Sequence, residues 1–432
     1  MNNIAKNSPA NDFLNSIGAN TSLSRRGEKL EKTIECVKYT GIRWFRSGYE
    51  GDIPPQDQIR AFEETGAKIS YGLESGGNDI GRLIRDAELF AKAGALLSFE
   101  GPNEPNNWSI KFEGEEGGRN LSWLPVAKMQ AALYKTVKNN PILKDYPVFS
   151  IGGESGAQVD NAGLQYLTIP ENAGTLMPDG TIFADYANIH NYFCHPSLRR
   201  LIDNITWYAA DPTLSQVPTG GGYDNLYGNY CVCWGGGRFT GYSVDDLKTL
   251  PRVTTETGIT LGTYDGAVDE DMHGRLIVSM YLSQFAHDYK YTALYILRDR
   301  SDEAGNQTFG LYQTDYTPRK AAVYLHNLTT ILHDDACATN SECDISCSYT
   351  IENQTDTVHD FVLQKSDGSL WLVLWNERFT GGSDDVTVKF ADKHNSLELY
   401  DIVSGTGSVK SYANTDTISL TMNCNPYVIR IG

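Results

Sequence analysis

The sequence of 432 residues has no long apolar stretch, and no run approaches the ~20 residues that a membrane-spanning helix needs. It also lacks an excess of basic residues: 36 lysines and arginines face 54 aspartates and glutamates, giving a formal net charge of −18. Such an acidic chain is a poor partner for nucleic acid or an anionic membrane surface. We therefore expect neither partner, and a highly anionic polysaccharide is disfavoured unless basic residues gather at the site.

Metal-binding patterns are also missing from the sequence. Cys231 and Cys233 are too closely spaced for a usual zinc pair, and no His-x-x-x-His follows them. The segment 13–19, which is predicted below to be the first strand, contains no His-x-His run. This absence disfavours a metal-dependent hydrolase built on a barrel. We expect neither a metal nor another cofactor.

The N-terminal segment 1–6 contains no apolar region of the kind that a signal peptide has. Several of the eight cysteines, however, lie in loop-like stretches: Cys337, Cys343 and Cys347 are close together, and Cys424 is near the C-terminus. Loop-borne cysteines are typical of disulfides in an oxidising compartment. We expect a secreted or periplasmic monomer with disulfides, whose signal peptide is not in this sequence. A cytosolic protein is the alternative.

Through about residue 330, short β-rich runs alternate with helical patterns, which is typical of a parallel sheet built from βα units. The expected strands are 13–19, 42–46, 68–73, a run ending near Glu104, 147–151, 186–192, 252–256 and 291–297. The expected helices include 28–39, 56–65, 80–93, 124–139, 270–287 and 319–332. Eight strand–helix pairs predict a protein of the α/β class with a (β/α)8 TIM barrel over residues 1–333.

From about Asp334 the helical periodicity is lost and alternating strands follow, separated by turn signals. They are expected at 360–364, 370–376, 386–390, 397–402 and 417–422. This pattern predicts a small all-β sandwich over residues 334–432. The join is short, so we expect the sandwich to pack rigidly on the barrel. Trp371 and Trp375 alternate within one strand and are expected to fill the core of the sandwich.

The segment Asn103-Glu104-Pro105 is the most informative part of the chain. It follows the apolar run 95–99, and a tryptophan, Trp108, comes soon after it. A barrel strand that ends in this way delivers a carboxylate to the C-terminal rim, and proline prevents the strand from continuing. A second glutamate, Glu256, ends the predicted strand 252–256. Two carboxylates on the rims of separate strands are what the hydrolysis of a glycosidic bond needs.

Three motifs together resemble the pattern of the retaining glycoside hydrolases of clan A. They are Asn103-Glu104 after strand four, His190-Asn191-Tyr192 on strand six and Glu256 at the end of strand seven. Several families of this clan also carry a C-terminal β-sandwich, so the resemblance covers the whole architecture, but it does not assign a family. It implies that Glu104 is the general acid/base and Glu256 the nucleophile. The chemistry agrees, because retention needs carboxyl groups roughly 5–5.5 Å apart, one protonated and one ionised.

The resemblance also implies roles for four further residues. Asn103 would hold the 2-hydroxyl of the sugar, and the hydroxyl of Tyr192 would contact Glu256 and keep it ionised. Arg46 would lie beside the nucleophile and lower its pKa. His190 faces the same way as Tyr192 by strand alternation and would contact either the substrate or the neighbouring side chains. Alternatively, the ring of Tyr192 only fills the layer of side chains that closes the barrel. The alternative for Arg46 is a salt bridge within the barrel wall.

Aromatic residues are concentrated in the loops after strands four and six. Trp108 and Trp123 lie in the first loop, and Trp207 and Trp234 in the second. Such rings stack on the apolar faces of sugars, and loops of this length are usually functional. Trp108 and Trp234 are the best candidates for sugar platforms.

These residues predict a retaining β-glycosidase that acts on an oligo- or polysaccharide. Rings on both flanks of the carboxylates favour endo action in an open cleft. The alternatives are an exo-acting glycosidase or a transglycosylase on the same scaffold, or a barrel that binds carbohydrate without cleaving it.

Overall fold

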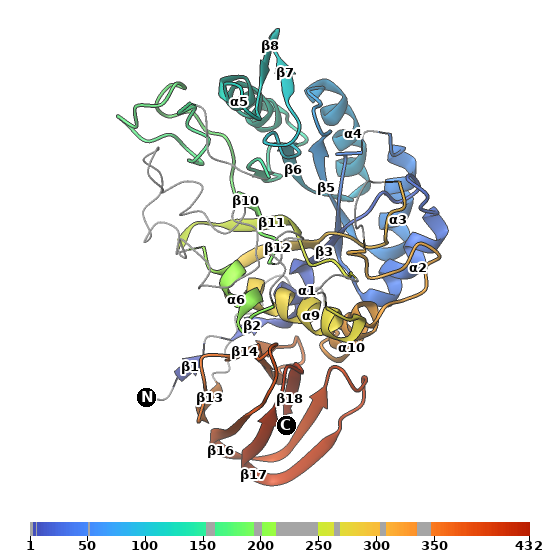
Figure 1. The fold of residues 1–432 in the computed structure, drawn as a ribbon, viewed down its shortest axis with the longest axis vertical. Coiled ribbons are helices and arrows are strands. Elements are labelled where there is room, and N and C mark those ends of the chain that lie inside the picture. The colour runs from blue at the N-terminus through green and yellow to red at the C-terminus, as the bar shows by residue number, and fades with distance from the viewer. Residues whose placement is uncertain are drawn as a thin grey trace.

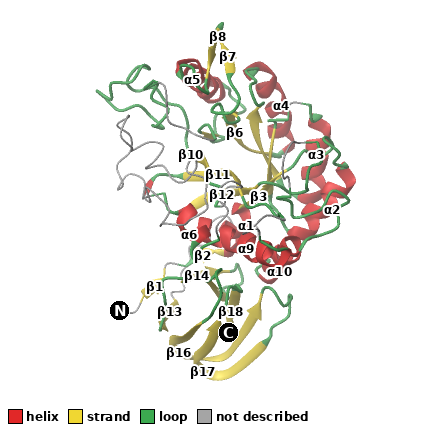
Figure 2. Cartoon of the chain, in the orientation of Figure 1, coloured by secondary structure: helices red, strands yellow, loops and turns green. Residues whose placement is uncertain are grey.

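The computed structural model has a barrel of parallel strands with helices around it and a β-sandwich packed beneath it (Figure 1). The residues described are 3–5, 7–50, 52–152, 160–193, 201–212, 249–262, 268–302, 308–334 and 347–432. Figure 2 shows α2, α3 and α4 outside the barrel strands and a C-terminal part built of strands and loops. The predicted fold class, a barrel followed by a sandwich, is confirmed.

All the barrel strands run parallel, in the order β10-β11-β12-β3-β4-β5-β6-β9. A parallel bridge between Phe149 and Tyr186 brings the two ends of this sheet together. The strands are β3 (Ile17–Asn20), β4 (Trp44–Ser47), β5 (Lys68–Leu73), β6 (Leu96–Pro102), β9 (Val148–Phe149), β10 (Ala187–His190), β11 (Arg252–Thr257) and β12 (Tyr289–Leu294). The C-terminal ends of parallel strands meet at one rim, so side chains distant in sequence converge there.

The helices are α1 (Ala10–Ser16), α2 (Leu30–Thr40), α3 (Pro55–Thr65), α4 (Ile80–Ala93), α5 (Leu124–Asn139), α6 (Ile205–Ala210), α9 (Glu270–Ala286) and α10 (Lys320–Ile331). Local signals set their ends. Asp79 caps α4 by accepting a hydrogen bond from the backbone N–H of Arg82, and Gly94 ends the helix with φ of 76°. A small hairpin of β7 (Ile110–Phe112) and β8 (Glu115–Gly117) lies in the loop after β6. Among the described helices, none is both long and apolar enough to cross a bilayer.

The prediction of a strand over 13–19 is wrong for its first part. Residues 10–16 form α1, and only the end of the predicted segment belongs to β3. The buried residues Ala10, Phe13, Leu14 and Ile17 follow the i, i+3, i+4, i+7 spacing of a helix face. Phe13 packs against Phe285, with ring centroids 5.2 Å apart. The helical period in this short apolar run was mistaken for a buried strand.

The sandwich consists of β13 (Cys347–Glu352), β14 (Val358–Gln364), β15 (Leu370–Asn376), β16 (Asp384–Asp401), β17 (Lys410–Met422) and β18 (Tyr427–Ile431). The predicted strands 386–390 and 397–402 are one long strand, β16, whose pairing with β17 shifts register between Lys389 and His394. The N-terminus contributes to the same sheet: β1 (Asn3–Ala5) pairs with β13, and β2 (Ser8–Pro9) pairs with β14. These first residues, which we assigned to the barrel, thus pair with the sandwich.

Strand β15 is buried on both faces and joins the two parts of the molecule. Its residues Leu370, Leu372 and Leu374 lie in the core of the sandwich. Trp371 and Trp375 lie instead in the larger core cluster that includes the barrel residues. The prediction that these tryptophans fill the core of the sandwich is therefore wrong. A strand covered on both faces gives no polar–apolar alternation, so the sequence does not indicate which face meets which partner.

No disulfide joins the cysteines in the described part of the chain. Among the described residues, Cys36, Cys347 and Cys424 carry free thiols. Cys231, Cys233, Cys337 and Cys343 lie outside the described residues.

Candidate active site

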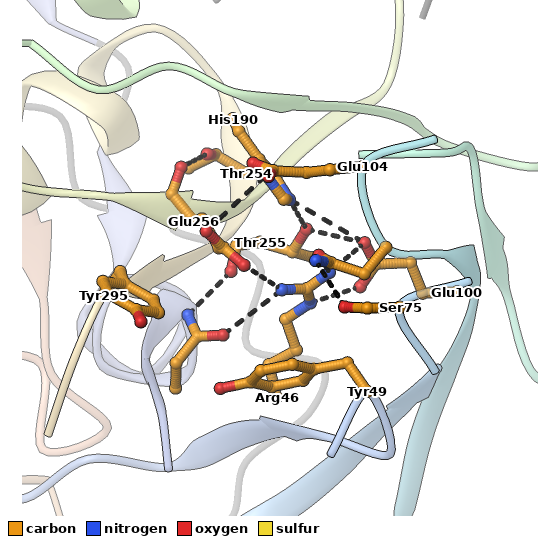
Figure 3. A network of polar contacts seen from close by, with 12 residues as sticks. Arg46, Tyr49, Ser75, Glu100, Glu104, His190, Thr254, Thr255, Glu256 and Tyr295 are labelled. Atoms are coloured by element: carbon orange, nitrogen blue, oxygen red, sulfur yellow. Dashed lines mark hydrogen bonds and ion pairs between the residues drawn. The ribbon is translucent and has the colours of Figure 1, made fainter. Parts of the chain in front are cut away.

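The two predicted catalytic glutamates meet at the C-terminal rim of the barrel. Glu256 is in β11, and Glu104 lies two residues beyond the end of β6. One carboxylate oxygen of each lies within 4.8 Å of the other (Figure 3). This separation is close to the roughly 5–5.5 Å of a double-displacement site and well below the roughly 6.5–9.5 Å that leaves room for an attacking water.

A tight turn presents the side chain of Glu104. Its backbone has φ of 40°, in the left-handed region that disfavours residues with a Cβ. The carbonyl of Glu104 accepts hydrogen bonds from the N–H groups of Asn107 and Trp108, at 2.8 and 2.9 Å. The side chain of Asn107 also donates to Glu104 Oε2, at 2.8 Å. The turn 104–108 thus fixes both the backbone and the carboxylate of Glu104.

Arg46, on β4, links the residues at the floor of the site. Its Nε and Nη2 donate to the two oxygens of Glu100, at 2.7 and 2.8 Å, and Nη1 donates to Glu256 Oε1. Nη2 also donates to Asn103 Oδ1, at 2.8 Å. Burial alone would lower the pKa of Arg46, but the carboxylates of Glu100 and Glu256 outweigh burial and raise it. Arg46 is therefore a permanent cation that contacts Glu256.

His190 and Tyr192 come from the end of β10 and face the two glutamates. The hydroxyl of Tyr192 donates to Glu256 Oε2 at 2.8 Å. His190 Nδ1 lies 2.7 Å from Glu104 Oε1 and 3.7 Å from Glu256 Oε2, and its Nε2 lies 3.1 Å from Thr255 Oγ1. Burial raises the pKa of Tyr192 well above its ordinary value, and the charge of Glu256 adds to this. Tyr192 therefore remains a hydrogen-bond donor to Glu256.

The pKa values of the two glutamates shift in opposite directions. Burial alone would raise the pKa of Glu104, but the hydrogen bond and the charge of His190 outweigh it and hold the pKa at about 2. Burial raises the pKa of Glu256, and His190, Arg46 and Tyr192 limit the rise. We expected Arg46 and Tyr192 to leave Glu256 as the stronger acid. In the ligand-free site Glu104 is the stronger acid, because His190 lies against it.

No family model matches the sequence, and no curated protein matches it. Solved structures, however, match over nearly the whole chain. A family 39 glycoside hydrolase from Bacteroides cellulosilyticus shares 15% identity, covering 98% of this chain and 82% of that one, with a TM-score of 0.59.

Two further matches span both chains almost completely. A GH51 arabinofuranosidase from Xanthomonas axonopodis pv. citri shares 11% identity, over 100% of this chain and 98% of that one, with a TM-score of 0.54. A bifunctional glucanase-xylanase from a metagenome library shares 10% identity, over 100% and 97% of the two chains, with a TM-score of 0.56. The chain shares the fold of these three glycoside hydrolases. The predicted resemblance is thereby confirmed at the level of fold, without assigning a family.

Glu100 is a site residue that the sequence analysis missed. It lies within β6 and is fully buried, and besides Arg46 it accepts hydrogen bonds from Asn188 Nδ2 at 3.0 Å and Thr255 Oγ1 at 2.9 Å. The signal was present: a glutamate inside an apolar strand must be paired when it is buried. Asn188 could also have been found, because it lies two residues before His190 on the same strand and alternation turns both inward.

Of the remaining predicted site residues, one is buried, one is exposed and one lies outside the described residues. Asn103 is buried, and its Nδ2 donates to Ser75 Oγ at 3.1 Å. Trp108 is 53% exposed at the end of the turn that holds Glu104. Trp234 lies outside the described residues.

Two of the four tryptophans that supported an open cleft are not exposed, since one is buried and the other is half-buried. Trp123 is fully buried. Trp207 is stacked on His359 of the sandwich, with ring centroids 3.8 Å apart. Both are therefore packing residues in this structure, and among the described tryptophans of these loops Trp108 is the one with an exposed ring.

Glu104, His190 and Glu256 are also the one group of three potential metal ligands found within the described ranges. Arg46 and Tyr192 already donate to the two oxygens of Glu256. A guanidinium in this position disfavours a divalent cation at this cluster.

Proposed function

We propose that this protein is a retaining glycoside hydrolase that cleaves a β-linked oligo- or polysaccharide by double displacement. The observation that carries the proposal is the separation of at most 4.8 Å between carboxylate oxygens of Glu104 and Glu256, each of which has its own set of partners. The shared fold supports it. A barrel that only binds carbohydrate would not need two carboxylates held in this way.

In the first step, Glu256 attacks the anomeric carbon and the bond to the leaving-group oxygen breaks. Arg46 and Tyr192 each hold one oxygen of Glu256 and so orient the carboxylate. Asn103 uses one amide hydrogen on Ser75, and we propose that its second N–H holds the 2-hydroxyl of the sugar. That contact strengthens as positive charge develops on the sugar ring.

The leaving group takes its proton from the Glu104–His190 pair. In the ligand-free protein His190 lowers the pKa of Glu104 to about 2, and His190 Nδ1 lies 2.7 Å from Glu104 Oε1. The side chain of Glu104 is 13% exposed, and a bound sugar would remove the water that reaches it. Desolvation raises the pKa of a carboxyl group, so substrate binding favours the protonated form of Glu104.

In the second step, the ester bond to Glu256 has removed the negative charge of that residue. Glu104, now a carboxylate, takes a proton from the water that attacks the anomeric carbon. The sugar is released with its original configuration, and both glutamates return to their starting states.

We also propose endo action, with Trp108 as a platform for the leaving part of the chain. Its exposed ring ends the turn that starts at Glu104, which protonates the leaving-group oxygen. An exo-acting glycosidase or a transglycosylase is the alternative on the same scaffold. We further propose that the protein works as a secreted or periplasmic monomer.

The test is a screen of the purified protein against aryl glycosides and polysaccharides, with the anomeric configuration of the first product read by proton NMR. Retained configuration, together with mass-spectrometric labelling of Glu256 by a 2-deoxy-2-fluoro glycoside, is the expected result. An inverted product contradicts the mechanism. Binding without turnover of any glycoside favours the carbohydrate-binding barrel.

A further inference from the structure

Glu377 is a buried carboxylate at the junction of sandwich and barrel. It follows β15, and its side chain accepts hydrogen bonds mainly from the barrel. Oε1 accepts from the hydroxyls of Thr206 and Ser283, the latter at 2.6 Å, and from Trp375 Nε1 at 3.2 Å. Oε2 accepts from the backbone N–H groups of Thr206 and Trp207, both at 3.1 Å. One carboxylate of the sandwich thus ties α6 to α9.

The sandwich also holds the residue that precedes α6. The backbone N–H of Asn204 donates to the carbonyl of Glu377 at 3.0 Å. Asn204 Nδ2 donates to the carbonyl of Asp356 at 2.9 Å, and its Oδ1 lies 2.9 Å from His359 Nε2. Because the first N–H groups of a helix have no partner within the helix, these contacts determine where α6 begins. Figure 1 shows α6 between the sandwich and β10.

A hydrogen bond links α6 to the segment that follows β10. Asn191 Nδ2 donates to the carbonyl of Ala209, on α6, at 2.9 Å. Asn191 is fully buried and lies between His190 and Tyr192. Strand alternation turns Asn191 away from the site and turns its two neighbours into it. The position of α6 therefore bears directly on the two side chains that contact Glu104 and Glu256.

We propose that Glu377 is a positioning residue for the active site, holding α6 so that Asn191 keeps His190 and Tyr192 against the two glutamates. The inference rests on the proposed function. It makes the sandwich a part of the catalytic unit rather than a separate sugar-binding module. A carboxylate suits this role because it accepts several hydrogen bonds at once, whereas an amide must donate at one end.

The test uses Glu377→Gln, in which the hydroxyls of Thr206 and Ser283 can turn to accept from the amide. We expect kcat on an aryl glycoside to fall about tenfold while KM changes little, since misplacement of catalytic groups by a fraction of an ångström has effects of this order. The pH profile of kcat/KM should shift, because the Glu104–His190 pair moves. Asn191→Ala breaks the link at its other end and should produce the same changes, so the test holds even if Glu377→Gln does not fold.

A double-mutant cycle adds a measure of coupling. The effects of Glu377→Gln and Asn191→Ala on kcat should be less than additive if both act along one path. Glu398→Gln is the control for lost stability of the sandwich, because Glu398 bonds to Tyr400 and Arg430, both within the sandwich and distant in sequence from Glu377. It should leave the pH profile unchanged. Folded Glu377→Gln and Asn191→Ala variants with parental kcat and pH profile would overturn the proposal.

A second measurement does not depend on turnover. In protein with labelled histidine, the imidazole NMR signal of His190, assigned by its loss in His190→Gln, should shift in Glu377→Gln and not in Glu398→Gln. A shift with no turnover by the parent protein supports the positioning role and refutes the proposed function. No shift refutes the positioning role, whatever the activity.

Discussion

Both carboxylate oxygens of Glu100 accept hydrogen bonds from the guanidinium of Arg46, at 2.8 and 2.7 Å. This two-point contact fixes the plane of the guanidinium, which leaves Nη1 directed at Glu256. Glu100 also offsets part of the charge of Arg46, and Arg46 both orients Glu256 and lowers its pKa. Several tests depend on this arrangement.

Glu100→Gln should destabilise the protein and reduce its activity together. It leaves a buried guanidinium with one carboxylate fewer, and breaking a buried ion pair costs about 3–5 kcal/mol of unfolding free energy. Thermal or denaturant unfolding and kcat/KM measure the two effects. Glu31→Gln is the control, because Glu31 pairs with Arg60 on the surface and is 65% exposed. A Glu100→Gln protein with parental stability would contradict the importance of this pair.

Glu256→Ala should lower kcat by a factor on the order of 10⁴ or more, as the loss of a nucleophile does in other enzymes. Azide should restore turnover of an activated glycoside, because the cavity left by the side chain admits a small anion. The product should then be a glycosyl azide of inverted configuration, identified by NMR. Activity near that of the parent would remove Glu256 as the nucleophile.

Glu104→Ala should separate substrates by their leaving groups. An aryl glycoside with a good leaving group needs little proton assistance, so the enzyme should still be glycosylated and the intermediate should accumulate. Substrates with poor leaving groups should lose about 10²–10⁴-fold in kcat/KM. Pre-steady-state kinetics with both substrate types measure this. Equal losses for both types would argue against the acid/base role.

Trp108→Ala tests the cleavage mode. A stacking contact contributes about 0.5–1.5 kcal/mol, so kcat/KM on a polysaccharide should fall about two- to tenfold. An aryl monoglycoside should be affected little. Leu121→Ala, another exposed apolar residue of the same loop, is the control. The early products of the parent decide between the modes: a range of oligosaccharide sizes supports endo action, and a single short product from the start excludes it.

The junction of sandwich and barrel should weaken in acid. Burial lowers the pKa of His359 to about 3, while an unfolded histidine has a pKa near 6.5. Between these values the unfolded state binds more protons, so stability falls as the pH falls from about 6.5, by at most about 1.4 kcal/mol per pH unit. Unfolding at pH 7 and pH 5 should show a smaller difference for His359→Gln than for the parent. His394→Gln, a replacement in β16, should behave like the parent.

Local sequence signals determined much of the barrel. The predicted helices 80–93 and 124–139 agree with α4 and α5 to the residue, because capping residues and apolar periodicity act within one element. Glu104 and Glu256 could be found for a similar reason, since a carboxylate that ends an apolar strand must lie at the rim. The short helix α1 was missed because a few apolar residues fit both the helical and the strand periods.

The sequence by itself therefore determined the alternation of strands and helices, the sandwich, and the positions of the two glutamates at strand ends. Tertiary structure alone decided that Glu100 holds Arg46, that Trp375 faces the barrel, and that the pKa of Glu104 lies below that of Glu256. These properties depend on which side chains from distant strands come into contact. The periodicity of the sequence indicates that a residue is buried, but it does not identify the neighbours of that residue. The charges and hydrogen bonds that set its pKa come from side chains that only the closed barrel brings together.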